Sequence, residues 1–432
     1  MLNAENELKK WAPVLDHSDA PPITDSYKKA VTAKLLENTE IALRQESAQS
    51  SFMTEAASQN TDSIASPDPV LISLVRRAMP NLIAYDVAGV QPMSGPTGLI
   101  FAMKARYGAA TGASRADITA SSTEAFKAEP DTDFSGTGTH AGQLLDSPGH
   151  FDEATGSTGT GIATGTAEAA GTATGLAEMG FTIEKATVTA KTRQLKAEYS
   201  MELAQDLKAV HGLDAESELA NILSGEILGE INREVIREIV TTGKSFQGAA
   251  AAAGKFNFAT DADGRWLQEK FQSLIFHIEQ AANKIALDTR RGKGNFVICS
   301  SNVASALAAA GKLVFGGEGE VNVDALGNTF AGTLNGRLKV YVDPYSSGDY
   351  ATVGYKGTSA YDAGLFYCPY VPLTMVRAVG ENSFQPKIAF KTRYGLVQNP
   401  LADELSTNSP GLNKSNVYYQ TFTVQNINND NG

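Results

Sequence analysis

The chain has 432 residues, of which 42% are hydrophobic and 19% are charged, and its formal net charge is -12. This length predicts two or three cores, and the balance of apolar and charged residues excludes disorder throughout. An acidic surface repels phosphate, so the composition also excludes the basic stripe that tight nucleic-acid binding needs.

The first 55 residues form a distinct N-terminal segment. Within it, residues 25–49 carry Tyr27, Val31 and Leu35 at a spacing of four, with mostly polar residues between them. This spacing predicts an amphipathic helix whose apolar side needs a partner.

A polar link from Ala56 to Pro69 follows the predicted helix. The sequence FMTEAAS at its start places Glu55 and Ala56 in a stretch that a protease can bind in extended form. No run in the chain approaches the ~20 apolar residues that cross a bilayer, so we expect neither a membrane span nor a secretion signal.

The next stretch predicts a short helix up to Arg77, an irregular turn with three prolines, and a strand over Leu99 to Arg106. From Gly108 to Glu178, Gly, Thr, Ala and Ser dominate, and large apolar residues are too few to build a core. We therefore expect a mobile loop or a small, weakly packed subdomain there.

A strand and a helix are predicted after this insertion, and a long helix then runs from Asp214, as its cap, to about Val240. At 1.5 Å per residue it would be ~40 Å long, enough to serve as the backbone of a flat domain. The residues on its apolar stripe are Leu219, Ile222, Leu223, Ile227, Ile231, Val235 and Ile239.

The C-terminal part mixes helices and strands. Helices are predicted at Trp266 to Asp288 and Val303 to Ala310, and a strand at Asn295 to Cys299. Several strands follow in LKVYVDP, YATVGYK, GLFYCPYV and KIAFKTRYGL. This is an α+β pattern without a strict βαβ repeat and without the long apolar runs of a parallel sheet.

Motifs that resemble functional sites are better explained by ordinary loops and surfaces. The glycine-rich GTGTHAG and GTGIATG neither follow an apolar strand nor open a periodic helix, and DADG at 261–264 lacks the later ligands of a calcium loop. The sequence contains no GxSxG elbow and no CxxC pair, and Cys299 and Cys368 are expected to be buried free thiols. The five scattered histidines, His17, His140, His150, His211 and His277, have no metal-ligand spacing.

Two compact basic clusters occur, at Arg193 to Lys196 and at Arg290 to Gly294. On an acidic chain such clusters are solvated faces or contacts with an acidic neighbour. We expect them to contact a neighbouring subunit, because of the resemblance described next.

A series of blocks resembles the major capsid protein of contractile-tailed phages of the T-even type. The first is VRRAMPNLIAYDVAGVQPMSGPTGLIFAMKARYG, and others follow in the same order, among them MGFTIEKATVTAKTRQLKAEYSMELAQDL, EINREV, RGKGNFVICSSNV, DAGLFYCPYVPLT and FQPKIAFKTRYGLVQNP. Together they span most of the chain from Val75 to Pro400. The Gly/Thr-rich insertion departs from this family, whose members carry a longer insertion domain.

The resemblance implies the Hong Kong 97-type phage capsid fold and a division of the chain into functional regions. It also implies that a phage protease removes residues 1–55 after Glu55, before Ala56, with Met53 as the apolar recognition residue two positions earlier. The implied regions are a scaffold-facing propeptide (1–55), an N-arm (56–96), an E-loop (97–198) with its insertion (108–178), a P-domain (199–294) with a spine helix (214–240), a region that is mainly A-domain (295–375), and a return to the P-domain with a tail (376–432).

The function implied is structural. Hexamers of the chain would tile an icosahedral or prolate head shell in the virion, assembled in the host bacterial cytoplasm, that encloses DNA without specific binding and uses no cofactor or metal. The implied partners are the chain itself, a capsid vertex protein, an internal scaffold, a prohead protease, decoration proteins and a folding chaperonin. The alternatives are a pentameric vertex protein of the same fold, an encapsulin-like compartment shell and an α/β enzyme.

Overall fold

The computed structural model describes most of the chain between residues 2 and 427. The described residues are 2–16, 23, 25–51, 82–108, 124–126, 130–140, 145–146, 150–151, 157–168, 177–246, 254–262, 264, 266–314, 322–323, 329–380, 385–401 and 416–427. The predicted helix that ends at Arg77 lies outside them.

The described helices range from one turn to 28 residues. They are α1 (Leu2–Leu15), α2 (Ser26–Ser51), α4 (Ala84–Val87), α5 (Thr164–Glu168), α6 (Met201–His211), α7 (Ala215–Thr242), α8 (Leu267–Thr289) and α9 (Ser301–Ala309). The helices predicted from periodicity at 25–49, 214–240, 266–288 and 303–310 are confirmed to within a few residues as α2, α7, α8 and α9.

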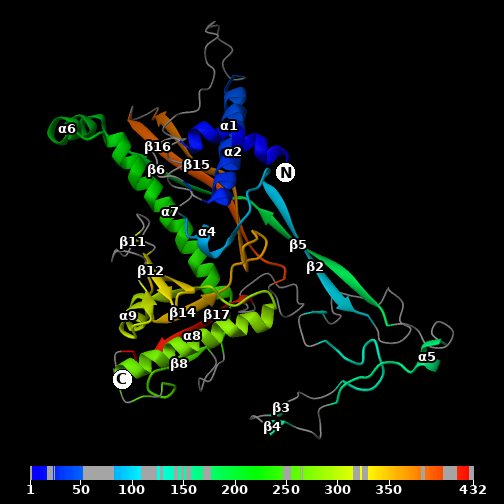
Figure 1. The fold of residues 1–432 in the computed structure, drawn as a ribbon. Helices are drawn as coiled ribbons and strands as arrows, with labels where there is room; N and C mark the ends of the chain where they lie inside the picture. The colour runs from blue at the N-terminus through cyan, green and yellow to red at the C-terminus, as the bar shows by residue number, and fades with distance from the viewer. Residues whose placement is uncertain are drawn as a thin grey trace.

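Two larger sheets form the body, and helix α7 runs between them (Figure 1). The four-stranded sheet has the order β1 (Gly89–Val90), β15 (Leu365–Val379), β16 (Pro386–Gln398), β6 (Lys191–Glu198). The nine-stranded sheet has the order β10 (Leu313–Val314), β12 (Thr329–Leu334), β13 (Leu338–Asp343), β9 (Phe296–Ser300), β14 (Tyr350–Gly354), β17 (Asn416–Gln425), β7 (Gly243–Ser245), with β11 (Asn322–Val323) on β12 and β8 (Lys255–Asn257) on β17.

A long antiparallel ribbon leaves the body and leads to the Gly/Thr-rich insertion (Figure 1). Its strands are β2 (Thr97–Tyr107) and β5 (Met179–Thr189), which pair over their whole length. The described parts of the insertion contain the short pair β3 (Leu145–Asp146) and β4 (His150–Phe151), and helix α5, which buries no residue.

The α+β prediction is confirmed, and some strand pairs of the body are parallel although the sequence has no long apolar runs. Strand β9 pairs parallel to β13, and β1 pairs parallel to β15. All five residues of β9 are buried, as in a strand covered on both faces, and a run this short gave no parallel signature in the sequence.

Helix α7 packs its apolar stripe into the core that joins the two sheets. Leu223, Ile227, Ile231, Val235 and Ile239 are buried in one cluster with residues of β13, β15, β16 and β17. Each such side chain stabilises the fold by about 1.5–3 kcal/mol. At 28 residues the helix is about 42 Å long.

Two details of the α7 prediction are wrong. Asp214 stands at the N-cap position, but its side chain makes no capping hydrogen bond. Ile222 was placed on the apolar stripe, yet it is 65% exposed. The stripe drifts around the helix because 3.6 residues per turn do not fit a fixed spacing, so Ala220 and Leu228 are buried instead.

A second core lies under helices α8 and α9 on the nine-stranded sheet. Leu274, Ile278 and Ile285 of α8 pack there with residues of β9, β13 and β14. A third, smaller cluster sits where the ribbon joins the four-stranded sheet, and it contains Met93 and Ile100. Among the described residues, no helix has the length and hydropathy that crossing a membrane requires.

Candidate assembly surfaces

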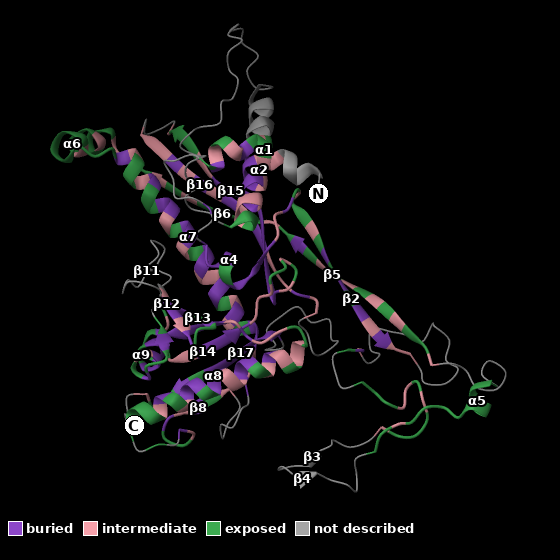
Figure 2. Cartoon of the chain, viewed as in Figure 1, coloured by how far each residue is buried: buried purple, intermediate pink, exposed green. Residues whose placement is uncertain are grey.

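The β2–β5 ribbon has one largely apolar face that is open to solvent, with Lys185 beside Phe101 as its charged residue (Figure 2). Residues at alternate positions share a face of a strand, and the register sets Met103 beside Ile183. The exposed fractions on this face are 64% for Phe101, 67% for Met103, 62% for Phe181 and 61% for Ile183. A two-stranded ribbon is marginally stable alone in water, so a bare apolar face of this kind indicates an interaction surface.

The opposite face of the ribbon carries charge and is buried on β2 and half-buried on most of β5. Lys104 Nζ and Arg106 Nη2 each lie 2.9 Å from a carboxylate oxygen of Glu184. Arg106 Nε also donates to Thr182 Oγ1 at 2.8 Å. Both cations are under 10% exposed, so this network crosses from β2 to β5 in a sheltered site and fixes the strand register.

Helix α6 is a second exposed element (Figure 2). The Ser200 hydroxyl caps its start by accepting from Leu203 N at 3.2 Å, and Gly212 ends it with a φ of 68°. None of its residues is buried, and Met201 and Val210 are 56% and 74% exposed. The helix therefore presents apolar side chains that the described part of the chain does not cover.

Helix α7 is joined to the four-stranded sheet by an arginine of β6. Arg193 Nη1 lies 2.7 Å from Glu230 Oε2, and Arg193 Nη2 lies 2.6 Å from Glu234 Oε2. Tyr394 of β16 donates its hydroxyl proton to Glu234. One guanidinium thus links two turns of α7 to the strands beside it.

A second arginine joins α7 to the nine-stranded sheet. Arg233 Nη1 lies 2.7 and 2.6 Å from the two carboxylate oxygens of Asp343, which is 1% exposed. Asp343 also accepts from the Tyr350 hydroxyl at 2.7 Å and from Tyr345 N at 3.0 Å. Burial, followed by the bond to Asp343, raises the pKa of Tyr350.

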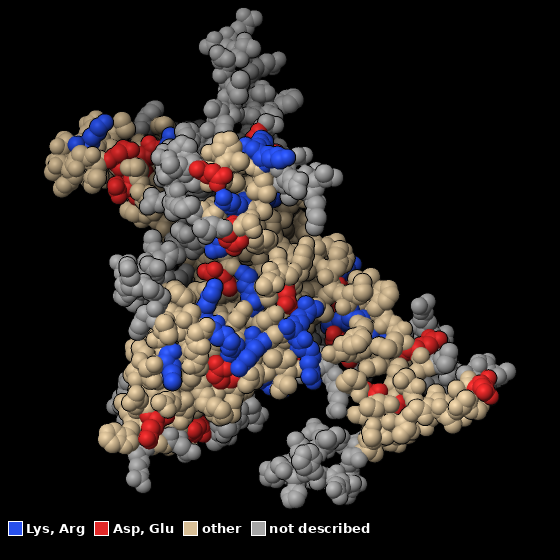
Figure 3. All heavy atoms as spheres, in the orientation of Figure 1, with Lys and Arg blue, Asp and Glu red and all other residues tan. Residues whose placement is uncertain are grey.

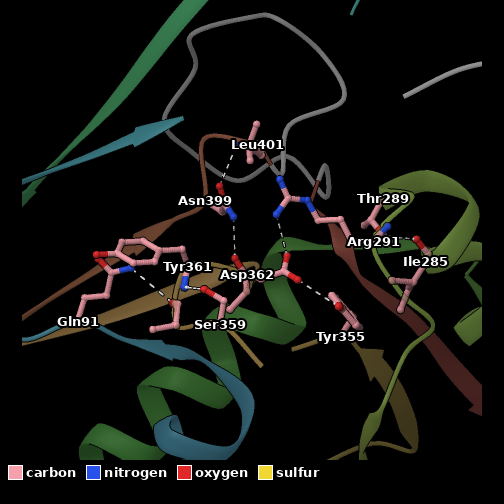
Figure 4. A network of polar contacts seen from close by, with 12 residues as sticks. Gln91, Ile285, Thr289, Arg291, Tyr355, Ser359, Tyr361, Asp362, Asn399 and Leu401 are labelled. Carbon is pink, nitrogen blue, oxygen red and sulfur yellow. Dashed lines mark hydrogen bonds and ion pairs between the residues drawn. The ribbon is translucent and has the colours of Figure 1, made fainter. Parts of the chain in front are cut away.

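A polar network connects the end of α8 with the turn before β15 (Figure 4). Asp362 accepts from Arg291 Nη1 and from the Tyr355 hydroxyl, both at 3.1 Å. Asn399, just after β16, donates to Ala363 O at 2.8 Å. These bonds join segments of both sheets at one point, which stabilises their relative orientation.

Several side chains of the two basic clusters, which were expected to contact a neighbouring subunit, have acidic partners within the chain. Arg193 and Arg291 form the intrachain ion pairs described above, and Lys293 Nζ lies 2.7 Å from Glu279. On the face in Figure 3, Lys and Arg side chains gather over the middle of the lower body, and a few Asp and Glu side chains lie beside them. The ion pairs of Arg193, Arg291 and Lys293 lie within the subunit, and contact of the clusters with a neighbouring subunit stays a prediction.

The described parts of the glycine-rich motifs are loops at residues 136–140 and 159–163, whereas Thr164 and Gly165 of the second motif begin helix α5. Thr137 of the first and Thr160 of the second donate to each other's carbonyl oxygens at 2.8 Å. In the DADG motif, Asp261 accepts from Asn257 N at 2.9 Å within a turn. Within the described ranges, no group of three or more His, Cys, Asp or Glu side chains could hold a metal ion.

Burial is the main cause of the shifted pKa values of His277 and Lys356. His277 lies among Phe246, Phe256 and Phe422, with ring centroids 4.7–4.9 Å away, and burial lowers its pKa to about 4. Burial also lowers the pKa of Lys356 to about 8, and its ammonium donates to Tyr85 O. The prediction of buried free thiols at the two cysteines is confirmed.

A groove of about 670 Å³ lies between α8 and α9. Its charged lining residue is Lys270, accompanied by the polar side chains of Asn302, Ser305 and Asn426. No carboxylate or imidazole lines it among the described residues, so it offers no acid–base pair. The predicted processing residues Met53, Glu55 and Ala56 lie outside the described residues.

Comparison with known proteins identifies the class to which the chain belongs, the shell proteins of phage heads. A sequence profile described as "Major capsid protein Gp23" matches residues 64–424. The major capsid protein of Salmonella phage ViI is 41% identical and covers 99% of both chains. That of Enterobacteria phage T4 is 36% identical over 97% of this chain and 98% of its own.

Two further likenesses are weaker. The capsid vertex protein of Enterobacteria phage T4 is 29% identical over 52% of this chain and 54% of its own. Among solved structures, the capsid of Myoviridae phage XM1 has a TM-score of 0.40 at 10% identity, covering 80% of this chain and 92% of that one.

The chain belongs to the Gp23 major capsid protein family, as the sequence resemblance indicated. With its long helix beside two sheets, an N-terminal strand on the first sheet and a projecting ribbon, it has the Hong Kong 97-type capsid fold expected for that family. Sequence reasoning missed the exposed apolar face of the ribbon, because LIFAM is apolar at every position and only the short FTI alternates.

Proposed function

We propose that the chain is a structural shell subunit without catalytic activity, and that hexamers of it tile the phage head through the apolar face of the β2–β5 ribbon. The observation that carries this proposal is the ribbon face formed by Leu99, Phe101, Met103, Phe181 and Ile183, each more than half exposed. Burying these side chains on a second copy removes a large apolar area from water, as obligate assemblies do.

The regions expected from the sequence are assigned to the observed elements on this basis. The ribbon is the E-loop, α7 is the spine of the P-domain, and the nine-stranded sheet belongs mainly to the A-domain. Residues 82–96, which lead into the ribbon, are the end of the N-arm. The net charge of -12 supports a shell that encloses DNA without specific contacts.

The remaining partners follow from the family. Residues 1–55 face the internal scaffold until a prohead protease cuts after Glu55, which Met53 helps it to recognise, and before Ala56. A vertex protein closes the shell, decoration proteins bind it, and a folding chaperonin assists the subunit in the host bacterial cytoplasm. A pentameric vertex role is the second candidate, but the vertex relative covers half of this chain while the major capsid relatives cover nearly all of it, which favours the hexameric role.

The ribbon proposal is tested by assembly with the scaffold and protease. Phe101→Ser with Phe181→Ser should yield soluble subunits and no shells in sedimentation and electron microscopy. Phe276→Ser is the matched control, since Phe276 of α8 is 63% exposed, close to the 64% of Phe101, but lies outside the ribbon. Normal shells from the double variant would contradict the proposal.

Processing is tested separately by the intact mass of the chain from mature heads. A species beginning at Ala56 is expected from the parent chain, and Glu55→Gln should leave the full-length chain. A full-length parent chain in mature heads would refute the cleavage.

A further inference from the structure

The N-terminal helices lie on the body of their own chain. Helix α2 packs against β15 and against α1, above the base of the ribbon (Figure 1). Val31, Leu35 and Leu36 of α2 and Trp11 and Leu15 of α1 belong to the same buried cluster as residues of the four-stranded sheet. The amphipathic helix predicted to need a partner therefore has one within the chain.

Asn38 of α2 donates hydrogen bonds to two segments that lie side by side, residues 89–93 and strand β15. The line of contact between these two segments is called the seam. The segment 89–93 runs along β15, and Asn38 lies above the point where they meet. Asn38 is 6% exposed, and its Nδ2 donates to Met93 O at 2.9 Å and to Tyr370 O at 3.0 Å. Three turns earlier, the Tyr27 hydroxyl donates to Val90 O.

The seam beneath α2 is short. Strand β1 pairs with β15 at Gly89 and Val90, and two further backbone bonds follow, from Gln91 N to Tyr367 O and from Met93 N to Pro369 O, both 2.9 Å. Gly89 permits this approach, since a Cβ there would lie 2.5 Å from Ala360 O. The contacts of α2 thus add to the few hydrogen bonds between residues 89–93 and β15.

Met93 connects this seam to the ribbon. Its carbonyl accepts from Asn38, while its side chain packs with Ile100 and Val188 at the ribbon base. The Met93 sulfur would lie 3.2 Å from a Cβ at Gly98, so β2 passes directly over it. A change at Asn38 therefore acts on the residue against which the ribbon base rests.

We propose that the seam between residues 90–93 and β15 is a binding site for an amphipathic helix with a central asparagine, filled here by α2, and that the helix stays bound after the chain is cut between residues 51 and 82. Cutting removes the tether, which sets only the effective concentration of the helix, and leaves the buried contacts intact. The bound helix stabilises the ribbon base until the helix is displaced. Cleavage of the chain and release of the helix are therefore separate steps.

This inference gives the proposed removal of residues 1–55 a second stage, but its test needs neither the natural cut site nor a shell. The full chain receives the recognition sequence of a site-specific protease between residues 56 and 69 and is cut after folding. Size-exclusion chromatography with mass spectrometry then shows whether the helical fragment elutes with the body. We expect co-elution at micromolar concentration.

Variants of α2 identify the contacts responsible. Asn38→Asp keeps the shape but removes both donors and sets a carboxylate against two carbonyl oxygens, so fragment affinity should fall at least tenfold. Tyr27→Phe, a milder change, should weaken retention less. Ile41→Ala is the control, because Ile41 is 46% exposed on the same helix, and it should leave retention unchanged.

Hydrogen–deuterium exchange tests the effect on the ribbon base. The amides of Gln91 and Met93 should exchange several-fold faster once the fragment is removed, and added peptide of residues 1–51 should restore their protection. Loss of the fragment from the parent chain upon cutting, or unchanged exchange without the fragment, would overturn the inference. Whether the chain is cut after Glu55 in phage heads does not affect the outcome of this exchange measurement.

Discussion

Helix α7 and the β2–β5 ribbon are both rich in apolar side chains, but the chain uses them in opposite ways. The α7 stripe is buried between two sheets, and Arg193 and Arg233 tie the helix to each sheet. The ribbon buries a charged face and leaves its apolar face in solvent. The difference indicates that α7 stabilises the subunit, while the ribbon is built for contact with another molecule.

The largest loss of subunit stability should come from the α7 core. Ile231→Ala removes a side chain that is 1% exposed and leaves a cavity, so it should lower the free energy of unfolding by about 2–5 kcal/mol. Ile222→Ala on the same helix, at a 65% exposed position, should change it by less than about 0.5 kcal/mol. Urea denaturation of unassembled subunits measures the free energy of unfolding of both variants. Equal losses would contradict the assignment of α7 stability to its buried side.

The second-largest loss of stability should come from the ion pair between α7 and the nine-stranded sheet. Arg233→Met leaves the buried Asp343 without its cation, although Tyr350 still donates to it, so the loss should be about 2–3 kcal/mol. Asp343→Asn in the same background should recover part of it. Thermal unfolding of the single and double variants checks this, and an additive loss in the double variant would exclude the ion pair as the cause.

A smaller, pH-dependent effect is expected at His277. Because its pKa in the folded chain is about 4, below the ordinary value of 6.5, the neutral form is favoured by folding. The corresponding stability is present above pH 6.5 and is lost as the pH falls toward 4, by about 2 kcal/mol at pH 5. His277→Phe should flatten the stability profile between pH 7 and 5, while a profile as steep as that of the parent chain would locate the titration elsewhere.

The smallest effect on the subunit should come from the ribbon face. Phe101→Ser should change the free energy of unfolding by less than about 0.5 kcal/mol, since this side chain is already 64% exposed. Urea denaturation of unassembled subunits checks it. A loss as large as that of Ile231→Ala would show that the ribbon supports its own subunit.

The long helices could be predicted because their periodicity is local. The spacing of Tyr27, Val31 and Leu35 predicted α2, and the stripe from Leu223 to Ile239 predicted α7. Strands β2, β15 and β16 followed from alternation or from short apolar runs. These patterns depend on neighbours a few residues apart, which the sequence displays directly.

The rest depends on residues far apart in the chain. Strand β17 was missed although TFTVQ in its second half alternates, because its first half, NVYYQ, is buried on both faces and shows no alternation. Helix α1 was missed because Pro13 interrupts its pattern. The pairing of Arg233 with Asp343 and of Asn38 with Tyr370 joins positions more than 100 residues apart, and no spacing rule connects them.

Cys368 offers a built-in reporter of movement at the foot of the ribbon. Its thiol is buried in the small cluster with Met93, Ile100 and Val188, and burial raises its pKa to about 12, so it is protonated and shielded from alkylating reagents. The thiol of Cys299 is equally buried, in β9 of the other sheet. If the ribbon moves during shell maturation, alkylation of Cys368 will accelerate while Cys299 stays unmodified. The rate of alkylation of the native chain then reports when the ribbon moves, without an added dye.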